Sequence, residues 1–178
     1  MEAFFSFLLS TLGVAFGVVA KSFWDRLMEK QEEIARLKRN KKLEILERQL
    51  SEFYWPLYLR LEKDNGSWNK VFDDGKGNLS LDIKRKLETG FILPNHDAIM
   101  EILETKMHLA RAHKELLDEI LKYIKHVALY KAIRGAGILD KDPYNFGEPF
   151  PSQLFQLLQA EKDQLQQEYD RILDLERK

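Results

Sequence analysis

The pattern of apolar residues along the chain divides it near residue 24. From Ala3 to Ala20 the sequence reads AFFSFLLSTLGVAFGVVA without a charged residue, and Trp24 follows shortly after. A helix from Ala3 to Trp24, at 1.5 Å per residue, is about 30 Å long, which matches the hydrocarbon thickness of a bilayer. We therefore predict a transmembrane anchor over residues 1–24, in preference to a buried core helix.

A cleaved signal peptide is the other alternative for this segment, because Val18 and Ala20 resemble a cleavage site. Signal peptides begin with basic residues, whereas only Glu2 and the amino group precede the apolar run. Basic residues instead follow it closely, beginning with Lys21, Arg26 and Lys30. Since positive charge stays on the cytoplasmic side, the N-terminus is predicted to face out and residues 25–178 to form a cytosolic domain.

Small residues recur within the apolar run at spacings of three and four, so that they share one face of a helix: Ala3, Ser6, Ser10, Gly13, Gly17 and Ala20. Helices in hydrocarbon associate by close backbone approach, and a small-residue face allows it. We therefore predict that the anchor packs against its own copies through Ser6, Ser10, Gly13 and Gly17. This packing implies a homo-oligomer, a tetramer or similar. The alternative is that small residues are simply common in membrane helices.

Beyond the anchor the apolar residues follow the helical period almost throughout, and no alternating run is long enough for a sheet. The spacing of Leu43, Leu46, Leu50, Phe53 and Leu57 indicates a helix packed against partners. The segment from Lys21 to about Asn65 is predicted to be one rod or two helices that meet near Pro56. The fold class is therefore all-α, an anchor followed by a cytosolic bundle of about five helices.

Local signals place the remaining helices. Ser80 caps a short helix that ends at Gly90, an extended link from Phe91 to Pro94 follows, and Asn95 is the N-cap of a helix that runs to about Ala110. Another helix spans about Lys114 to Arg134 and closes at Gly135. A proline-rich loop precedes a final amphipathic helix that starts near Ser152.

Composition narrows the chemistry. A net charge of -1 argues against binding of DNA or long RNA, and the absence of cysteine removes disulfides and thiolate chemistry. The four histidines, at positions 96, 108, 113 and 126, have no established metal-ligand spacing. No phosphate-binding glycine loop or nucleophile motif occurs. We therefore expect no enzyme, no resident metal and no cofactor.

The best candidate site is a polar and aromatic stripe on the helix that ends near Arg134. Tyr123, His126, Tyr130 and Arg134 are spaced three, four and four apart, beside an apolar stripe that suffices for core packing. Rings, hydrogen-bond donors and one permanent charge suit a nucleotide-like anion. The alternative is a helix face that is solvated or contacts another subunit.

Three further residues join this candidate site. Asn95 and His96 stand at a predicted helix N-terminus, which attracts anions through its free N–H groups, although a plain N-cap explains them equally well. Arg60 is a polar exception at the end of an aromatic segment, Phe53 to Arg60, that otherwise indicates core or interface.

Three segments behind the N-terminal span carry a resemblance to a known family: FYWPLYLRLEKDN from Phe53, ILPNH from Ile92 and YIKHVALYKAIR from Tyr123. The chain resembles small membrane effectors of type III CRISPR defence that lack the CARF sensor domain. The resemblance implies an oligomer in the bacterial inner membrane whose cytosolic helical domain binds cyclic oligoadenylate and acts through the membrane lipid. It also implies ligand contacts at Asn95–His96 and between His126 and Arg134.

The function expected from the sequence is an antiviral effector that binds a cyclic oligoadenylate, with cyclic tetra-adenylate as the first candidate, and perturbs the membrane through its oligomerised anchors. A first alternative is a membrane scaffold that recruits a protein partner through the aromatic segment. A second is a metal-dependent hydrolase built on the histidines. The three functions predict different binding partners for the chain: a nucleotide for the effector, a protein for the scaffold and a metal ion for the hydrolase.

Overall fold

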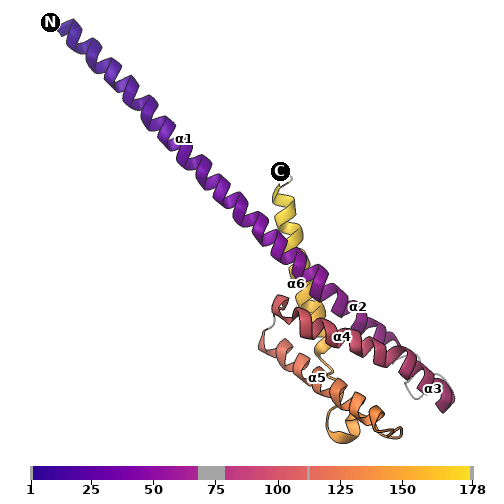
Figure 1. Cartoon of the computed structure of the whole chain (residues 1–178). Helices are drawn as coiled ribbons and strands as arrows, with labels where there is room; N and C mark the ends of the chain where they lie inside the picture. The colour runs from indigo at the N-terminus through magenta and orange to yellow at the C-terminus, as the bar shows by residue number, and fades with distance from the viewer. Residues whose placement is uncertain (1, 68–78, 112, 177–178) are drawn as a thin grey trace. The chain divides into compact units, whose positions relative to one another are not determined.

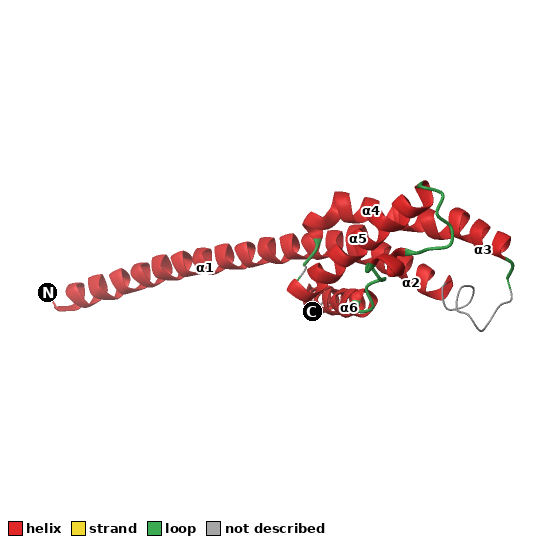
Figure 2. Ribbon diagram, turned by 90° about the horizontal axis from the view of Figure 1, so that it is seen from below, coloured by secondary structure: helices red, strands yellow, loops and turns green. Residues whose placement is uncertain are grey.

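The computed structural model describes residues 2–67, 79–111 and 113–176, with the backbone alone given for residues 2–20, 81 and 176. Helices account for nearly all of the described chain, and no strand occurs in these ranges (Figure 2). The predicted all-α class is confirmed. The chain divides into two compact units, Met1–Glu44 and Ile45–Lys178.

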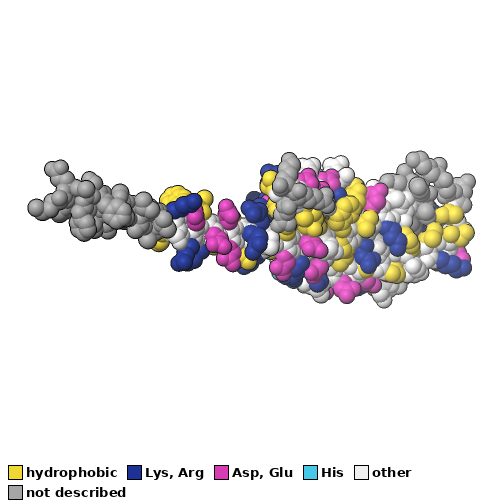
Figure 3. Space-filling view, turned by 90° about the horizontal axis from the view of Figure 1, so that it is seen from above, with side chains coloured by type: hydrophobic (Ala, Val, Ile, Leu, Met, Phe, Trp, Pro, Cys, Tyr) yellow, Lys and Arg dark blue, Asp and Glu magenta, His cyan; other side chains and the backbone are white. Residues whose placement is uncertain are grey.

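The first unit belongs to a single helix, α1, which runs from Glu2 to Gln49. From Lys21 to Lys42 every side chain is exposed, Phe23 and Trp24 among them, and charges of both signs alternate along it (Figure 3). Within the residues that the structure describes, no helix combines the length and the apolar content needed to cross a bilayer. The predicted anchor and its small-residue face, Ser6 to Gly17, fall on side chains that lie outside this described part.

The second unit is a helical bundle whose elements are coloured in chain order in Figure 1. After the end of α1 they are η1 (Leu50–Tyr54), α2 (Trp55–Ser67), α3 (Leu81–Leu87), η3 (Glu88–Ile92), α4 (Leu93–Lys106), η4 (Met107–Leu109), α5 (Lys114–Gly135), η5 (Pro143–Phe146) and α6 (Leu154–Glu176). Helix α2 packs against α4 and α6, while α5 packs against α4 and α6.

The core of the bundle follows the helical spacing seen in the sequence. Leu46, Leu50, Phe53, Leu57 and Leu61 recur every three or four residues, and all are buried. Facing side chains from the other helices complete this core: Ile99, Leu103, Leu116, Ile120, Val127, Leu154, Leu158 and Leu165. Phe53, Tyr54 and Leu57 of the aromatic segment belong to this core, with at most 1% of their surface exposed, whereas Trp55 and Leu59 are 36% and 57% exposed.

Two prolines are accommodated by wide π-helical turns instead of chain breaks. The residue before each proline donates its N–H to a carbonyl five residues earlier: Trp55 to Leu50, and Leu93 to Glu88. The wider turn makes room for the ring of the proline, which has no N–H to donate. The chain therefore stays helical through Pro56 and Pro94.

This geometry corrects two sequence predictions. Phe91 to Pro94 is not an extended link, because Ile92 and Leu93 have helical dihedrals. Asn95 is not an N-cap, because it lies inside the first turn of α4 and its side chain is buried. By contrast, Ser80 does cap α3 by accepting from Ile83 N–H at 3.4 Å, and α5 ends at the predicted Gly135.

Candidate functional site

A buried cluster of Asp64, Asn95 and His96 joins α2 to α4. Asn95 Nδ2 donates to Asp64 Oδ1 at 2.7 Å and to the Arg60 carbonyl at 2.9 Å, while Arg60 Nη1 donates to Asn95 Oδ1 at 3.4 Å. His96 Nε2 lies 3.4 Å from Asp64 Oδ2. Asn95 and Arg60 therefore hold two helices together, and Asp64 and His96 form the polar end of this cluster.

His126 comes from α5 and faces the same cluster. Its ring centre lies 6.2 Å from that of His96 and 5.6 Å from that of Phe150. Its Nδ1 lies 2.9 Å from the Glu148 carbonyl oxygen, which only accepts, so Nδ1 carries the proton and Nε2 is an acceptor. Burial lowers the pKa of His126, which keeps the ring neutral near pH 7.

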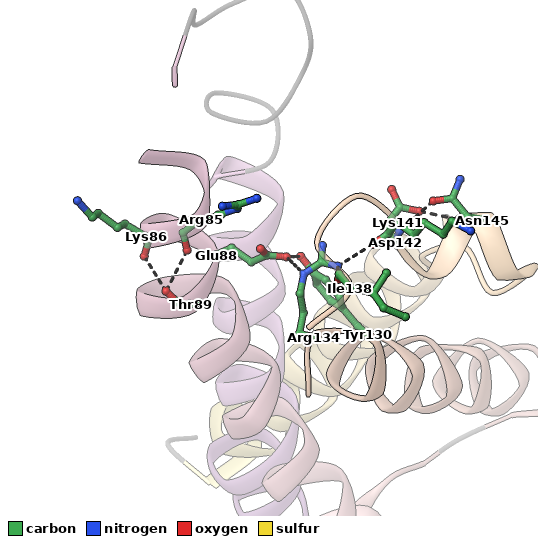
Figure 4. Close-up of polar contacts among 10 residues, drawn as sticks. All are labelled: Arg85, Lys86, Glu88, Thr89, Tyr130, Arg134, Ile138, Lys141, Asp142 and Asn145. Carbon is green, nitrogen blue, oxygen red and sulfur yellow. Dashed lines mark hydrogen bonds and ion pairs between the residues drawn. The ribbon is translucent and has the colours of Figure 1, made fainter. Parts of the chain in front are cut away.

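Tyr130 and Arg134, one turn apart on α5, meet a buried carboxylate. Arg134 Nε donates to Glu88 Oε1 at 2.7 Å, and the Tyr130 hydroxyl donates to the same oxygen (Figure 4). Burial, reinforced by this hydrogen bond, raises the pKa of Tyr130. Arg134 Nη1 also donates to the carbonyls of Ile138 and Lys141, at 2.9 and 2.6 Å. The guanidinium is thus occupied within the fold.

Four of these residues line one cavity of about 600 Å³. Asp64 comes from α2, His96 from α4, and His126 and Tyr130 from α5. The loop between α5 and α6 forms a further wall with Asp142, Pro143, Tyr144, Pro149, Phe150 and Ser152. This volume is in the range of small-ligand sites, and its mixture of apolar walls with a few polar groups is typical of them.

Three buried polar atoms near the cavity have no hydrogen-bond partner among the described residues: Asp64 Oδ2, His96 Nδ1 and the Tyr123 hydroxyl. Tyr123 and His96 are neighbours, with ring centres 5.8 Å apart. Buried polar groups are nearly always satisfied, so these three atoms are exceptions among the described residues. Asp64 Oδ2 nevertheless lies 3.4 Å from His96 Nε2. Burial raises the pKa of Tyr123, so its hydroxyl stays protonated.

The structure gathers the candidate residues more closely than the sequence indicated, but with changed roles. His96, His126 and Tyr130 line the cavity. Tyr123 is fully buried beside His96 and does not line the cavity, so the polar stripe of α5 faces the interior and is not a solvated face. Asn95, Arg60 and Arg134 make internal hydrogen bonds and do not line the cavity.

Two acidic residues of the site were not among the predicted ones. Asp64 and Glu88 are 7% and 8% exposed, yet each stands in a strongly polar stretch of sequence, LEKDNGS and KRKLETG. Such stretches are usually solvated helix faces. Nor did the sequence indicate the aromatic wall of Tyr144 and Phe150, because a proline-rich loop carries no periodicity from which a lining can be read.

The histidines do not assemble a metal site within the described ranges, where no group of three or more His, Asp or Glu side chains has suitable geometry. His113 instead caps α5 by accepting from Leu116 N–H at 3.2 Å.

Comparison with protein-family models, curated proteins and solved structures gives no match for this chain.

Proposed function

We propose that this chain is a membrane-anchored antiviral effector whose cytosolic domain binds a cyclic oligoadenylate, with cyclic tetra-adenylate as the first ligand to test. Residues 1–24 form the anchor in the bacterial inner membrane, and ligand binding perturbs that membrane through the packed anchors of a homo-oligomer. The chain catalyses no reaction in this proposal, because its output is a conformational change.

The observation that carries the proposal is the cavity. His96, His126 and Tyr130 come from two helices and line one space of about 600 Å³, and they belong to the segments on which the resemblance places ligand contacts. Tyr144 and Phe150 add aromatic surface to the same space. Aromatic rings bind nucleobases by stacking, whatever the sequence of the oligonucleotide.

The symmetry of a cyclic ligand supports the proposed homo-oligomer. A ring of identical nucleotides presents the same group several times, and identical subunits related by symmetry offer one matching site each. The cavity volume suits one small ligand group per copy of the chain. Tighter binding to one arrangement of the cytosolic domains would then shift the oligomer toward that arrangement and move the anchors with it.

The sequence pattern supports the anchor. An uncharged run of membrane length precedes Lys21, Arg26 and Lys30, which fits an N-terminus outside and a domain inside. The exposed Phe23 and Trp24 suit the headgroup level that follows such a run.

Isothermal titration of the full chain in detergent with cyclic tetra-adenylate tests the binding step. We expect saturable heat, and we expect Tyr144→Ala to weaken binding about tenfold, since stacking on one base contributes about 1–3 kcal/mol. Tyr144 is 74% exposed, so its replacement leaves the core intact. Phe146→Ala is the matched control on the same short helix, because Phe146 is exposed but does not line the cavity. Absence of heat at every soluble ligand concentration would rule out the sensor.

A further inference from the structure

The cavity is bordered by two carboxylates, Asp64 and Asp142, and no lysine or arginine occurs among its described lining residues. Asp64 is buried, whereas Asp142 is exposed and therefore stands where the cavity opens to solvent. The charge of Asp142 acts on the cavity wall, because burial lowers the pKa of His126 and the carboxylates of Asp142 and Glu148 partly oppose that fall. The open side of the cavity is therefore negatively charged.

Each of the two carboxylates follows a lysine whose ammonium faces a ring outside the cavity. Lys141 Nζ lies 6.0 Å from the centre of the Phe146 ring, and Lys63 Nζ lies 4.3 Å from the centre of the Phe91 ring. Neither Phe146 nor Phe91 lines the cavity. These two lysines therefore supply no direct counter-charge inside it. A phosphate group in the cavity would lose its hydration beside like charges, which is strongly unfavourable in a partly dry site.

The walls of the cavity suit an uncharged ring. Tyr130, Phe150 and Phe155 line it, and Tyr144 lies at its exposed side. The ring centres of Phe150 and His126 are 5.6 Å apart, with the two rings at 84° to each other. A flat aromatic group gains contact area against such walls without any ionised partner.

We propose that the cavity admits an uncharged aromatic base, that the phosphates of the ligand stay outside, and that Asp142 is the residue that excludes them. The inference rests on the proposed function for the nature of the ligand, and it adds a specificity to that function. A cyclic oligoadenylate holds its phosphates within the ring as diesters, so a base can enter the cavity while the ring stays in solvent. AMP carries a terminal phosphate with about two negative charges, and Asp142 therefore disfavours it.

Asp142→Asn removes the charge and preserves the local structure. Asp142 Oδ1 accepts from Asn145 N–H at 3.3 Å, and Asn145 Oδ1 accepts from Asp142 N–H at 2.9 Å (Figure 4). An amide oxygen can accept the first bond, and the second needs only the backbone N–H of residue 142. Asp140→Asn is the matched control, because Asp140 is exposed on the same loop and does not line the cavity.

The experiment measures displacement of cyclic tetra-adenylate from the full chain in detergent by adenosine, AMP and inorganic phosphate. We expect adenosine to compete, AMP to compete at least about fivefold more weakly, and phosphate not to compete. Asp142→Asn should remove most of the difference between AMP and adenosine by strengthening AMP alone, whereas Asp140→Asn should keep the difference. Competition by phosphate, stronger competition by AMP than by adenosine, or the same result in both variants would overturn the proposal.

The salt dependence of binding to the unaltered chain provides a second test. Salt screens the repulsion between exposed charges, so the affinity for AMP should rise as salt is added while that for adenosine stays level. A phosphate that is bound by cations shows the opposite, a loss of affinity with salt. Should Asp142→Asn fail to fold, an AMP affinity that falls with salt would still overturn the proposal.

The outcomes distinguish the base site from the proposed function. If cyclic tetra-adenylate binds but adenosine does not displace it, the base site is wrong and the sensor stands. If direct titration shows that adenosine binds more tightly than AMP, with a difference that depends on Asp142, while cyclic tetra-adenylate does not bind, the base site stands and the proposed function is wrong. If neither adenosine nor cyclic tetra-adenylate binds, both are wrong.

Discussion

Arg134 Nε and Glu88 Oε1 lie 2.7 Å apart, with only 15% and 10% of the two side chains exposed. The pair joins α5 to the π-helical turn η3, and the same guanidinium binds the carbonyls of Ile138 and Lys141 (Figure 4). Arg134 of α5 therefore holds the start of the loop that lines the cavity.

Removal of Glu88 should destabilise the bundle strongly. Glu88→Ala leaves the Arg134 guanidinium and the Tyr130 hydroxyl without their shared acceptor, and loss of one partner of a largely buried pair costs about 3 kcal/mol or more. Urea denaturation of the full chain measures this. Asp82→Ala is the control, because the Asp82–Lys86 pair on neighbouring α3 is more than 70% exposed and contributes at most about 1 kcal/mol. Equal losses in the two variants would contradict the role given to Glu88.

The same substitution at two tyrosines of α5 should lower stability at Tyr130 but not at Tyr123. Tyr130→Phe removes a hydrogen bond to a carboxylate and should lower the free energy of unfolding by about 1.5–3 kcal/mol. Tyr123→Phe removes a fully buried hydroxyl that has no partner in the described residues, so stability should stay level or rise by about 1 kcal/mol. Thermal unfolding compares them, and a comparable loss at Tyr123 would mean that its hydroxyl is hydrogen-bonded.

His126 should make the bundle sensitive to mild acid. Its pKa in the folded chain lies below the ordinary value of 6.5 because of burial. Above 6.5 both folded and unfolded chains hold the neutral ring, so its contribution to stability is complete. As the pH falls from 6.5 through the lower folded pKa, the unfolded chain takes up the proton first and stability decreases.

Comparison of variants isolates this contribution of His126 from that of other groups. Melting temperatures between about pH 8 and about pH 5 should fall less steeply for His126→Gln than for the unaltered chain. The exposed His108 provides the control, and His108→Gln should follow the unaltered chain. Identical slopes for all three proteins would exclude His126 as a source of acid sensitivity.

The predicted anchor is testable without any ligand. The full chain produced in bacteria should remain with the membrane fraction after an alkaline carbonate wash, because an uncharged run of about 20 residues spans the hydrocarbon layer. A chain that begins at Lys21 should be released by the same wash. Release of the full chain would contradict the anchor over residues 1–24.

Features set by local chemistry could be predicted from the sequence. Ser80 caps α3, because its hydroxyl acts within one helical turn. Helix α5 has the predicted Gly135 as its last residue, but the left-handed position just past its end belongs to Gly137, at φ 74°. The apolar spacing from Leu46 to Leu57 likewise identified the core face. His96, His126 and Tyr130, assigned from the sequence to one candidate site, line one cavity.

The features that depend on distant residues could not be predicted. Asp64 is hydrogen-bonded to Asn95, 31 residues away, and Glu88 to Arg134, 46 residues away. The sequence around each carboxylate therefore looks like that of a solvated helix face. Pro56 and Pro94 look the same in a sequence whether the helix stops or widens into a π-turn. The chain widens into a π-helical turn at both prolines, and with the turn before Pro94 Asn95 loses the predicted N-cap position.

Release of a fluorescent dye from vesicles that contain the full chain tests the central claim most directly. The account predicts that cyclic tetra-adenylate causes dye release, and that Tyr144→Ala requires about tenfold more ligand while Phe146→Ala behaves as the unaltered chain. Vesicles that retain their dye while the chain demonstrably binds the ligand would contradict the claim that binding acts through the membrane.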